Sequence, residues 1–152
     1  MEEAVSWYEK AAEQGNLWAA YRLGKLYLEG KDVSKNAARA VEYLTDAAQA
    51  GNQYAQYTLG KLYLTVKEVP YDEEQAVYWL TRSAEQDNQY AQYMLGKLYL
   101  MGQGVQQDQV QAMNWFSRSA AQGNQYAQFF LERQSDLRPP SVMLAATRLL
   151  YT

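Results

Sequence analysis

The chain has 152 residues and no cysteine, so disulfide bonds and thiolate metal sites are excluded. Its 14 lysines and arginines against 17 aspartates and glutamates give a formal net charge of -3, which offers no broad attraction to nucleic acid or to an anionic membrane. No apolar run approaches the roughly 20 residues that span a bilayer, so we expect a cytoplasmic protein without metal, cofactor, membrane or nucleic-acid contact.

The dominant feature of the sequence is a unit of 36 residues that recurs four times. The equivalent positions are Ala4, Ala40, Ala76 and Ala112; Trp7, Tyr43, Trp79 and Trp115; Ala12, Ala48, Ala84 and Ala120; and Asn16, Asn52, Asn88 and Asn124. A unit of this length cannot bury an apolar face alone, so neighbouring units must stack. Few residues are β-branched and many favour helix. We therefore predict an all-α superhelix, a right-handed solenoid of four helical hairpins with no sheet.

The start of the chain lies inside a repeat rather than before one. In register, Met1 takes the position of Glu73, one residue inside the first helix, so the residue that would cap that helix is missing. We expect the chain to be a piece of a longer protein, cut at a repeat boundary; a start codon that falls there is the alternative. The predicted divisions are repeat 1 (1–36), repeat 2 (37–72), repeat 3 (73–108), an incomplete repeat 4 (109–138) and a capping helix (139–152), together forming one solenoid domain.

The third repeat shows the two helices of a hairpin most clearly. Asp72 precedes a run over 73–85 with apolar residues at helical spacing, and Asp108 stands one repeat later, so both are predicted N-caps. The residues predicted to end the first helix in a left-handed conformation are Gly15, Gly51, Asp87 and Gly123. The asparagine series then caps the second helix, which is predicted over 89–101 in repeat 3.

Glycine recurs in the middle of the second helix, at Gly24, Gly60 and Gly96. Because glycine costs about 1 kcal/mol there relative to alanine, we infer that a neighbouring helix approaches closely. The residues expected to be buried between repeats are Ala12, Leu23, Leu59, Ala84, Leu95 and Ala120. Repeat 4 has Glu132 in place of the glycine, which indicates that no ordinary repeat packs beyond it. After Pro139 and Pro140 the chain has the apolar spacing of a short capping helix.

The residues of one period match a known pattern. They are Ala76, Trp79, Ser83, Ala84, Asn88, Ala91, Gln92, Leu95, Gly96, Tyr99, Gly102, Gly104, Val105 and Asp108. With these residues the chain resembles the Sel1-like repeat family over 1–131, a relative of the tetratricopeptide repeats with two more residues per unit. The resemblance implies a protein–protein adaptor rather than a catalyst. Repeat 2 departs from the pattern, with Val66 and Glu68 where the family usually has glycines, so we expect its loop to adopt a different backbone.

Two segments near the end of the chain carry a second resemblance. Residues 125–131 and 140–150 look like the C-terminal region of relaxase or mobilisation proteins from Gram-positive mobile elements. Such proteins can carry Sel1-like repeats behind a nuclease domain. The nuclease itself holds a divalent metal with a histidine cluster, and this chain has no histidine, so it is not the nuclease.

No group of residues suggests catalysis. Without histidine or cysteine, acid–base chemistry would have to come from carboxylates or lysines. Asp72, Glu73 and Glu74 are adjacent, but they stand at a helix start, where capping and the helix dipole explain them. The tyrosines, such as Tyr63 and Tyr99, recur at a core position and are interpreted as packing residues. We predict that the chain is not an enzyme.

An exposed stripe on the second helix is the candidate binding surface. In repeat 2 it contains Tyr54, Thr58, Lys61 and Thr65, separate from the stripe that faces the core. The full set of candidate residues is Trp18, Lys25, Tyr54, Lys61, Tyr90, Lys97, Tyr126 and Arg133. Stacking would set an aromatic row beside a cationic row. By resemblance to tetratricopeptide arrays, these rows are expected to face the concave groove.

The sequence thus predicts a non-catalytic scaffold that binds a protein or peptide segment in its groove. Lysines beside tyrosines suit an extended peptide with acidic side chains or a free carboxylate. The alternative is a structural spacer or dimerisation arm of a mobilisation protein, without a ligand of its own. In that case the tyrosines only pack between helices and the lysines are only solvated, since duplication copies residues whether or not they bind.

Overall fold

The computed structural model describes residues 2–30 and 34–134. Within these ranges the chain forms eight α-helices and no strand. The helices are α1 (Glu2–Glu13), α2 (Leu17–Glu29), α3 (Ala37–Gln49), α4 (Gln53–Thr65), α5 (Glu73–Glu85), α6 (Gln89–Met101), α7 (Gln109–Ala121) and α8 (Gln125–Glu132). The all-α prediction is confirmed, whereas the capping helix predicted over 139–152 lies outside the described residues.

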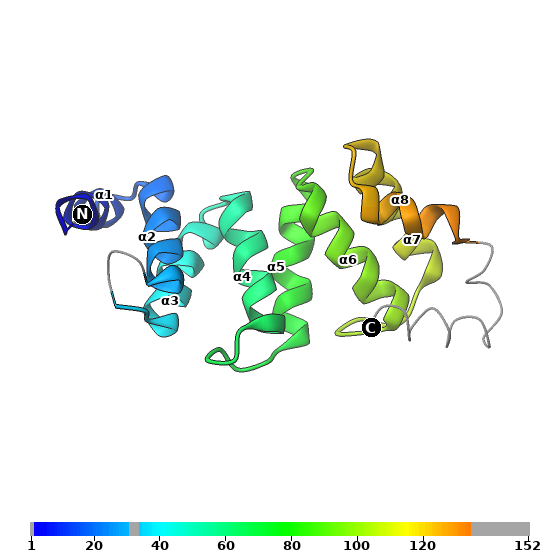
Figure 1. Ribbon diagram of the computed structural model, residues 1–152, viewed down its shortest axis with the longest axis horizontal. Coiled ribbons are helices and arrows are strands. Elements are labelled where there is room, and N and C mark those ends of the chain that lie inside the picture. Colours follow the sequence, from blue (N-terminus) through cyan, green and yellow to red (C-terminus); the bar gives the residue numbers. More distant parts are fainter. Residues whose placement is uncertain (1, 31–33, 135–152) are drawn as a thin grey trace.

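The helices follow one another in a single elongated row, from α1 at one end to α8 at the other (Figure 1). The turns within the α5–α6 and α7–α8 hairpins lie along one edge of the row, and the longer α4–α5 loop lies along the opposite edge. Contacts join mainly helices that are neighbours in the chain, and they are most extensive between α2 and α3, α4 and α5, and α6 and α7. The predicted stacking of hairpins into a solenoid is therefore confirmed.

Side-chain caps and left-handed residues define the hairpins, as the sequence predicts. The Asp72 carboxylate accepts a hydrogen bond from the backbone N–H of Gln75 at 3.0 Å, and Asp108 caps α7 in the same way. The side chain of Asn88 accepts from the N–H of Ala91, also at 3.0 Å, at the start of α6. The turn residues with positive φ are Gly15 (90°), Gly51 (103°), Asp87 (67°) and Gly123 (96°). Each reverses the chain between the two helices of one hairpin.

The mid-helix glycines allow close approach by the next repeat. Gly24, Gly60 and Gly96 face Leu44, Leu80 and Phe116, respectively. A Cβ atom added at Gly60 would lie 2.7 Å from Cγ of Leu80, well inside van der Waals contact. Because Leu80 is fully buried against α4, its burial offsets the helix-propensity cost of the glycine.

Polar side chains join repeat 3 to repeat 2 and repeat 4 to repeat 3. Gln86 Nε2 donates a 2.9 Å hydrogen bond to Gln56 Oε1, and Ser83 Oγ donates a 2.8 Å bond to the carbonyl of Gln53. The equivalent bonds at the next junction run from Gln122 Nε2 to Gln92 Oε1 (2.9 Å) and from Ser119 Oγ to the carbonyl of Gln89 (2.7 Å). Between repeats 1 and 2 the corresponding residues are Ala20, Ala47 and Ala50. That junction therefore lacks these polar bonds.

Burial follows position along the row. Leu23, Leu59, Ala84 and Leu95 are fully buried, as expected. The expectation was wrong for Ala12 and Ala120, which are only half-buried. Each belongs to a terminal hairpin, which has a described neighbouring hairpin on one side only. Among the described residues, no helix has both the length and the apolar character needed to cross a membrane.

The loops between repeats differ in backbone, as the missing glycines of repeat 2 predict. Helix α6 ends at Gly102 in the left-handed region, with φ 69°. Helix α4 ends at Val66 with φ -93° and ψ 120°, which is extended backbone. A β-branched residue avoids the left-handed region, so the loop after α4 leaves the helix in a different direction.

Candidate functional site

The candidate residues lie on the surface formed by α2, α4, α6 and α8, which we call the even-helix face. The aromatic members are exposed: Trp18 by 54%, Tyr54 by 50%, Tyr90 by 56% and Tyr126 by 71%. Among the cations, Lys61 and Arg133 are exposed, and Lys25 and Lys97 are half-buried. The core-facing stripe of the same helices, represented by Leu59, is fully buried, so the two predicted stripes are indeed separate.

A second aromatic row, not singled out from the sequence, joins the first row into a ladder. It consists of Tyr21, Tyr57, Tyr93 and Phe129. Ring centroids lie 6.1 Å apart for Tyr21 and Tyr54, 6.0 Å for Tyr57 and Tyr90, and 5.8 Å for Tyr93 and Tyr126, so each pair connects one repeat to the next. The signal was present in the sequence: these residues share the period of the first row and follow it by three positions on the same helix face.

Cations of the even-helix face lie beside the rings of this second row. The Lys97 Nζ atom is 4.7 Å from the centre of the Tyr93 ring, and Lys25 Nζ is 5.8 Å from the Tyr21 ring. The Arg133 guanidinium lies 3.8 Å from the Phe129 ring. Each cation follows its ring by four residues, which places both on one side of the helix. The positive charges are thus held among the aromatics.

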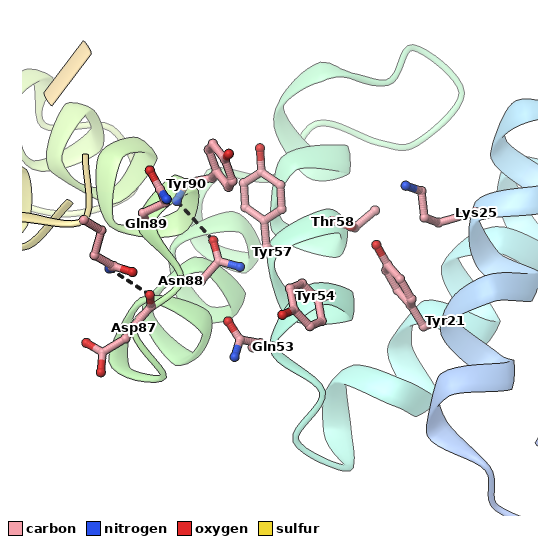
Figure 2. A pocket seen from close by; sticks show the side chains of 11 residues that line it. Tyr21, Lys25, Gln53, Tyr54, Tyr57, Thr58, Asp87, Asn88, Gln89 and Tyr90 are labelled. Atoms are coloured by element: carbon pink, nitrogen blue, oxygen red, sulfur yellow. Dashed lines mark hydrogen bonds between the residues drawn. The ribbon is translucent and has the colours of Figure 1, made fainter. Parts of the chain in front are cut away.

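The first hollow of the face lies between α2, α4 and α6 and has a volume of about 400 Å³. It is lined by Tyr21, Lys25, Gln53, Tyr54, Tyr57, Thr58, Asp87, Asn88, Gln89, Tyr90 and Gln122. Figure 2 shows Tyr21 beside Tyr54 and Tyr57 beside Tyr90, with Lys25 extending from α2. The Asp87 carboxylate accepts a 2.9 Å ion-pair hydrogen bond from Arg118 of α7. The lining of this hollow therefore includes Lys25 and also Asp87, whose carboxylate is paired with Arg118.

The second hollow lies between α4, α6 and α8 and has a volume of about 520 Å³. It is lined by Tyr57, Lys61, Thr65, Gln89, Tyr90, Tyr93, Met94, Lys97, Gly123, Asn124, Gln125 and Tyr126. Four aromatic rings and a methionine provide its apolar surface. The lining contains two lysines and no carboxylate, so its charge is purely positive.

The structure brings six of the eight candidate residues to these hollows. The first hollow contains Lys25, Tyr54 and Tyr90, and the second contains Lys61, Tyr90, Lys97 and Tyr126. The other two, Trp18 and Arg133, line neither hollow. Trp18 packs at the end of the ladder, with its ring 5.4 Å from that of Tyr21.

Burial changes the acidity of several groups in the ladder. It raises the pKa of the Tyr57 and Tyr93 phenols, and the adjacent Tyr90 and Tyr126 phenols raise these pKa values further. Burial also lowers the pKa of the Lys97 ammonium. At neutral pH the phenols are therefore uncharged hydrogen-bond donors, and Lys97 is a cation that water solvates only in part.

The functional groups of this face are aromatic rings, hydrogen-bond donors and cations. Over 2–30 and 34–134, no three histidine, cysteine, aspartate or glutamate side chains come together in a way that could hold a metal ion. The face presents aromatic surface, phenol and amide donors, and ammonium groups that have no ion-pair partner within the described part of the chain. These groups suit contact with an anionic, partly apolar chain.

Comparison with known proteins identifies the repeat. A family model described as Sel1 repeat matches residues 1–16, 19–52, 53–88 and 89–124. None of the curated proteins compared with the chain matches it.

Solved structures share the fold. A Sel1 repeat protein from Oxalobacter formigenes is 36% identical, with a TM-score of 0.76, over 82% of this chain and 94% of its own. A protective antigen of uropathogenic Escherichia coli, described as displaying an SLR fold, is 38% identical, with a TM-score of 0.77; the match covers 80% of this chain and 26% of the antigen. Cysteine rich protein B of Helicobacter pylori, at 23% identity and a TM-score of 0.65 over 86% of this chain and 93% of its own, shows the fold alone. None of these three descriptions supports the resemblance to relaxases.

Proposed function

The chain belongs to the Sel1 repeat family, and on that premise we propose that its even-helix face docks an extended, acidic segment of another protein. Sel1 repeat proteins are generally protein-interaction scaffolds. The proposal goes further in naming the face and the character of the partner. It also implies that the chain contributes binding rather than catalysis.

The distribution of charge is the observation that carries the proposal. Helices α4 and α6 each contain a single charged residue, Lys61 and Lys97, respectively. Both lysines lie on the even-helix face and both line the second hollow. A chain with a net charge of -3 thus presents a positive central stretch on this face, which is complementary to an acidic partner.

The aromatic ladder supports an extended shape for the partner. Its ring pairs recur along the row of repeats, so a segment that runs along the row meets the same chemistry at each repeat. Tyrosine rings offer large apolar contact at small entropic cost, and their hydroxyl groups offer hydrogen bonds to a peptide backbone. Aromatic residues are also common hot spots of protein interfaces.

The experiment compares short displayed peptides from three libraries. Each library mixes glycine and apolar residues with one polar class: aspartate and glutamate, asparagine and glutamine, or lysine and arginine. We expect binders from the acidic library. Their affinity should fall by about a hundredfold in the double variant Lys61→Glu, Lys97→Glu, because attractive charge contacts become repulsive.

The matched control is Lys35→Glu with Lys67→Glu. These lysines are exposed, line neither hollow and give the same change in net charge. Binding should survive in this variant. Equal enrichment from the amide or basic library would contradict the acidic partner, and no binder from any library would favour the spacer or dimerisation arm of a mobilisation protein.

A further inference from the structure

The positive groups of the even-helix face are not equivalent, and their surroundings separate them. In the first hollow, Lys25 shares the lining with the Asp87 carboxylate. In the second hollow, Lys61 and Lys97 share the lining with no carboxylate. In the first hollow an incoming anion meets a single lysine and a lining that also includes Asp87, which is paired with Arg118, whereas in the second it meets two lysines and no acidic residue. The second hollow is thus the better anion site.

Within the second hollow, Lys97 is set apart from Lys61 by burial. Lys61 is exposed, whereas Lys97 is half-buried, with its Nζ atom 4.7 Å from the Tyr93 ring centre. Among the residues that the structure describes, the ion-pair partner of Asp87 is Arg118, and Lys97 has no carboxylate within ion-pair distance. Burial lowers the pKa of Lys97, as expected for an ammonium group that has lost water without gaining a counterion.

A partly dehydrated cation without a counterion gains more from an anion than an exposed cation does. The Coulomb energy is larger where the effective dielectric constant is lower, and part of the desolvation cost has already been incurred on folding. In the same hollow as Lys97, the rings of Tyr57, Tyr90 and Tyr126 and the Met94 side chain supply apolar surface. A ligand that fills the hollow must therefore combine one negative group with an apolar neighbour.

We propose that Lys97 is the anchor of the even-helix face: its ammonium binds the carboxylate of one aspartate or glutamate side chain, while an adjacent apolar residue of the same segment packs on the tyrosines of the second hollow. This inference rests on the proposed function. It adds a single dominant contact and a recognition unit, an acidic residue next to an apolar one. The ammonium group of a lysine is a compact point charge, so it suits contact with a single carboxylate and does not require the two parallel hydrogen bonds that an arginine would form.

The test uses the full chain and a peptide selected from the acidic library. Lys97→Met should weaken binding about tenfold, whereas Lys61→Met and Lys25→Met should each weaken it less than about threefold. Methionine keeps the length and apolar stem of lysine, and circular dichroism checks that each variant keeps its helices. Each acidic residue of the peptide is then replaced in turn by glutamine, in a double-mutant cycle.

The double-mutant cycle distinguishes this inference from the proposed function on which it rests. We expect one peptide carboxylate whose replacement weakens binding about tenfold in the unmodified chain and has no further effect in Lys97→Met. If the peptide binds but the three lysine variants lose affinity equally, or if the peptide carboxylate is coupled to Lys61, Lys97 is not the anchor. Either result would still be consistent with docking on the even-helix face. Absence of binding by every library would overturn both.

Discussion

Gln122 Nε2 donates a 2.9 Å hydrogen bond to Gln92 Oε1, and the same Gln92 side chain donates through Nε2 to the carbonyl of Ala84 at 3.1 Å. The bonds link α7, α6 and the end of α5. Gln92 is fully buried, so both ends of its amide must find partners inside the protein. Gln56 has the same role one repeat earlier, where its Nε2 donates to the carbonyl of Ala48.

The polar junctions predict a difference between single and combined substitutions. Gln56→Ala should lower the free energy of unfolding by about 1 to 3 kcal/mol, because the carbonyl of Ala48 loses a buried hydrogen bond and the exposed Gln86 amide keeps only its bond to the carbonyl of Gly51. The triple variant Gln56→Ala, Ser83→Ala, Gln86→Ala copies the alanines of the first junction. Its loss of unfolding free energy, measured by urea unfolding, should be smaller than the sum of the losses in the three single variants. Simple additivity would show that the bonds are not coupled.

Gly60→Leu tests the close approach of α5 to α4. Leucine favours helix over glycine by about 1 kcal/mol, but its side chain would occupy the space of Leu80. We expect a net loss of stability of about 1 to 3 kcal/mol from overpacking, measured by thermal or urea unfolding. Lys61→Leu is the matched control, since it adds leucine at the next, exposed position of the same helix. If both variants are equally stable, the close-approach explanation is wrong.

Alkaline pH should destabilise the protein through the half-buried phenols of Tyr57 and Tyr93. Burial raises the pKa of Tyr57 and Tyr93 above the ordinary value of 10.0. The stability that these protonated phenols contribute is therefore fully present below pH 10. It is lost as the pH rises from 10 through the raised pKa values of the folded state, because the unfolded chain releases these protons first. The double variant Tyr57→Phe, Tyr93→Phe should lose less stability than the unmodified chain above about pH 10. Parallel pH profiles for the two proteins would contradict this.

Lys97 should reduce stability while it serves binding. Its pKa is lowered by burial, so the charged form costs free energy in the folded state at every pH at which both states are protonated. Lys97→Met should therefore raise the melting temperature at neutral pH. This gain in melting temperature should shrink as the pH rises through the lowered pKa of Lys97 toward 10.5, the pH at which the lysine of the unfolded chain also loses its charge. A variant that is less stable at neutral pH would show that the contact with Tyr93 outweighs the desolvation.

The sequence was sufficient for features that depend on neighbouring residues. Asp72, Asp87 and Asn88 act on residues within a few positions of themselves, so the limits of α5 and the start of α6 could be predicted from caps and turns. Periodicity also identified the candidate face, because residues of equal phase stack on one side of a solenoid.

The rest depends on contacts between repeats and on distance from the ends of the row. Trp7 and Trp79 have the same phase, yet Trp7 is 72% exposed and Trp79 only 5%, because Trp7 lies in the terminal helix α1. Lys25 and Lys97 also share a phase, and only the three-dimensional structure adds Asp87 to the surroundings of one and not of the other. No local pattern contains this information.

The central claim, that the even-helix face receives an acidic segment, is tested most directly by the ring signals of the tyrosines. In a chain with isotope-labelled tyrosine, titration with a peptide from the acidic library should shift the signals of the tyrosines lining the two hollows, Tyr21, Tyr54, Tyr57, Tyr90, Tyr93 and Tyr126. The signals of Tyr8 on α1 and Tyr78 on α5, which line neither hollow, should remain in place. Shifts centred on Tyr8 and Tyr78, or binding that leaves the six signals unmoved, would contradict the account.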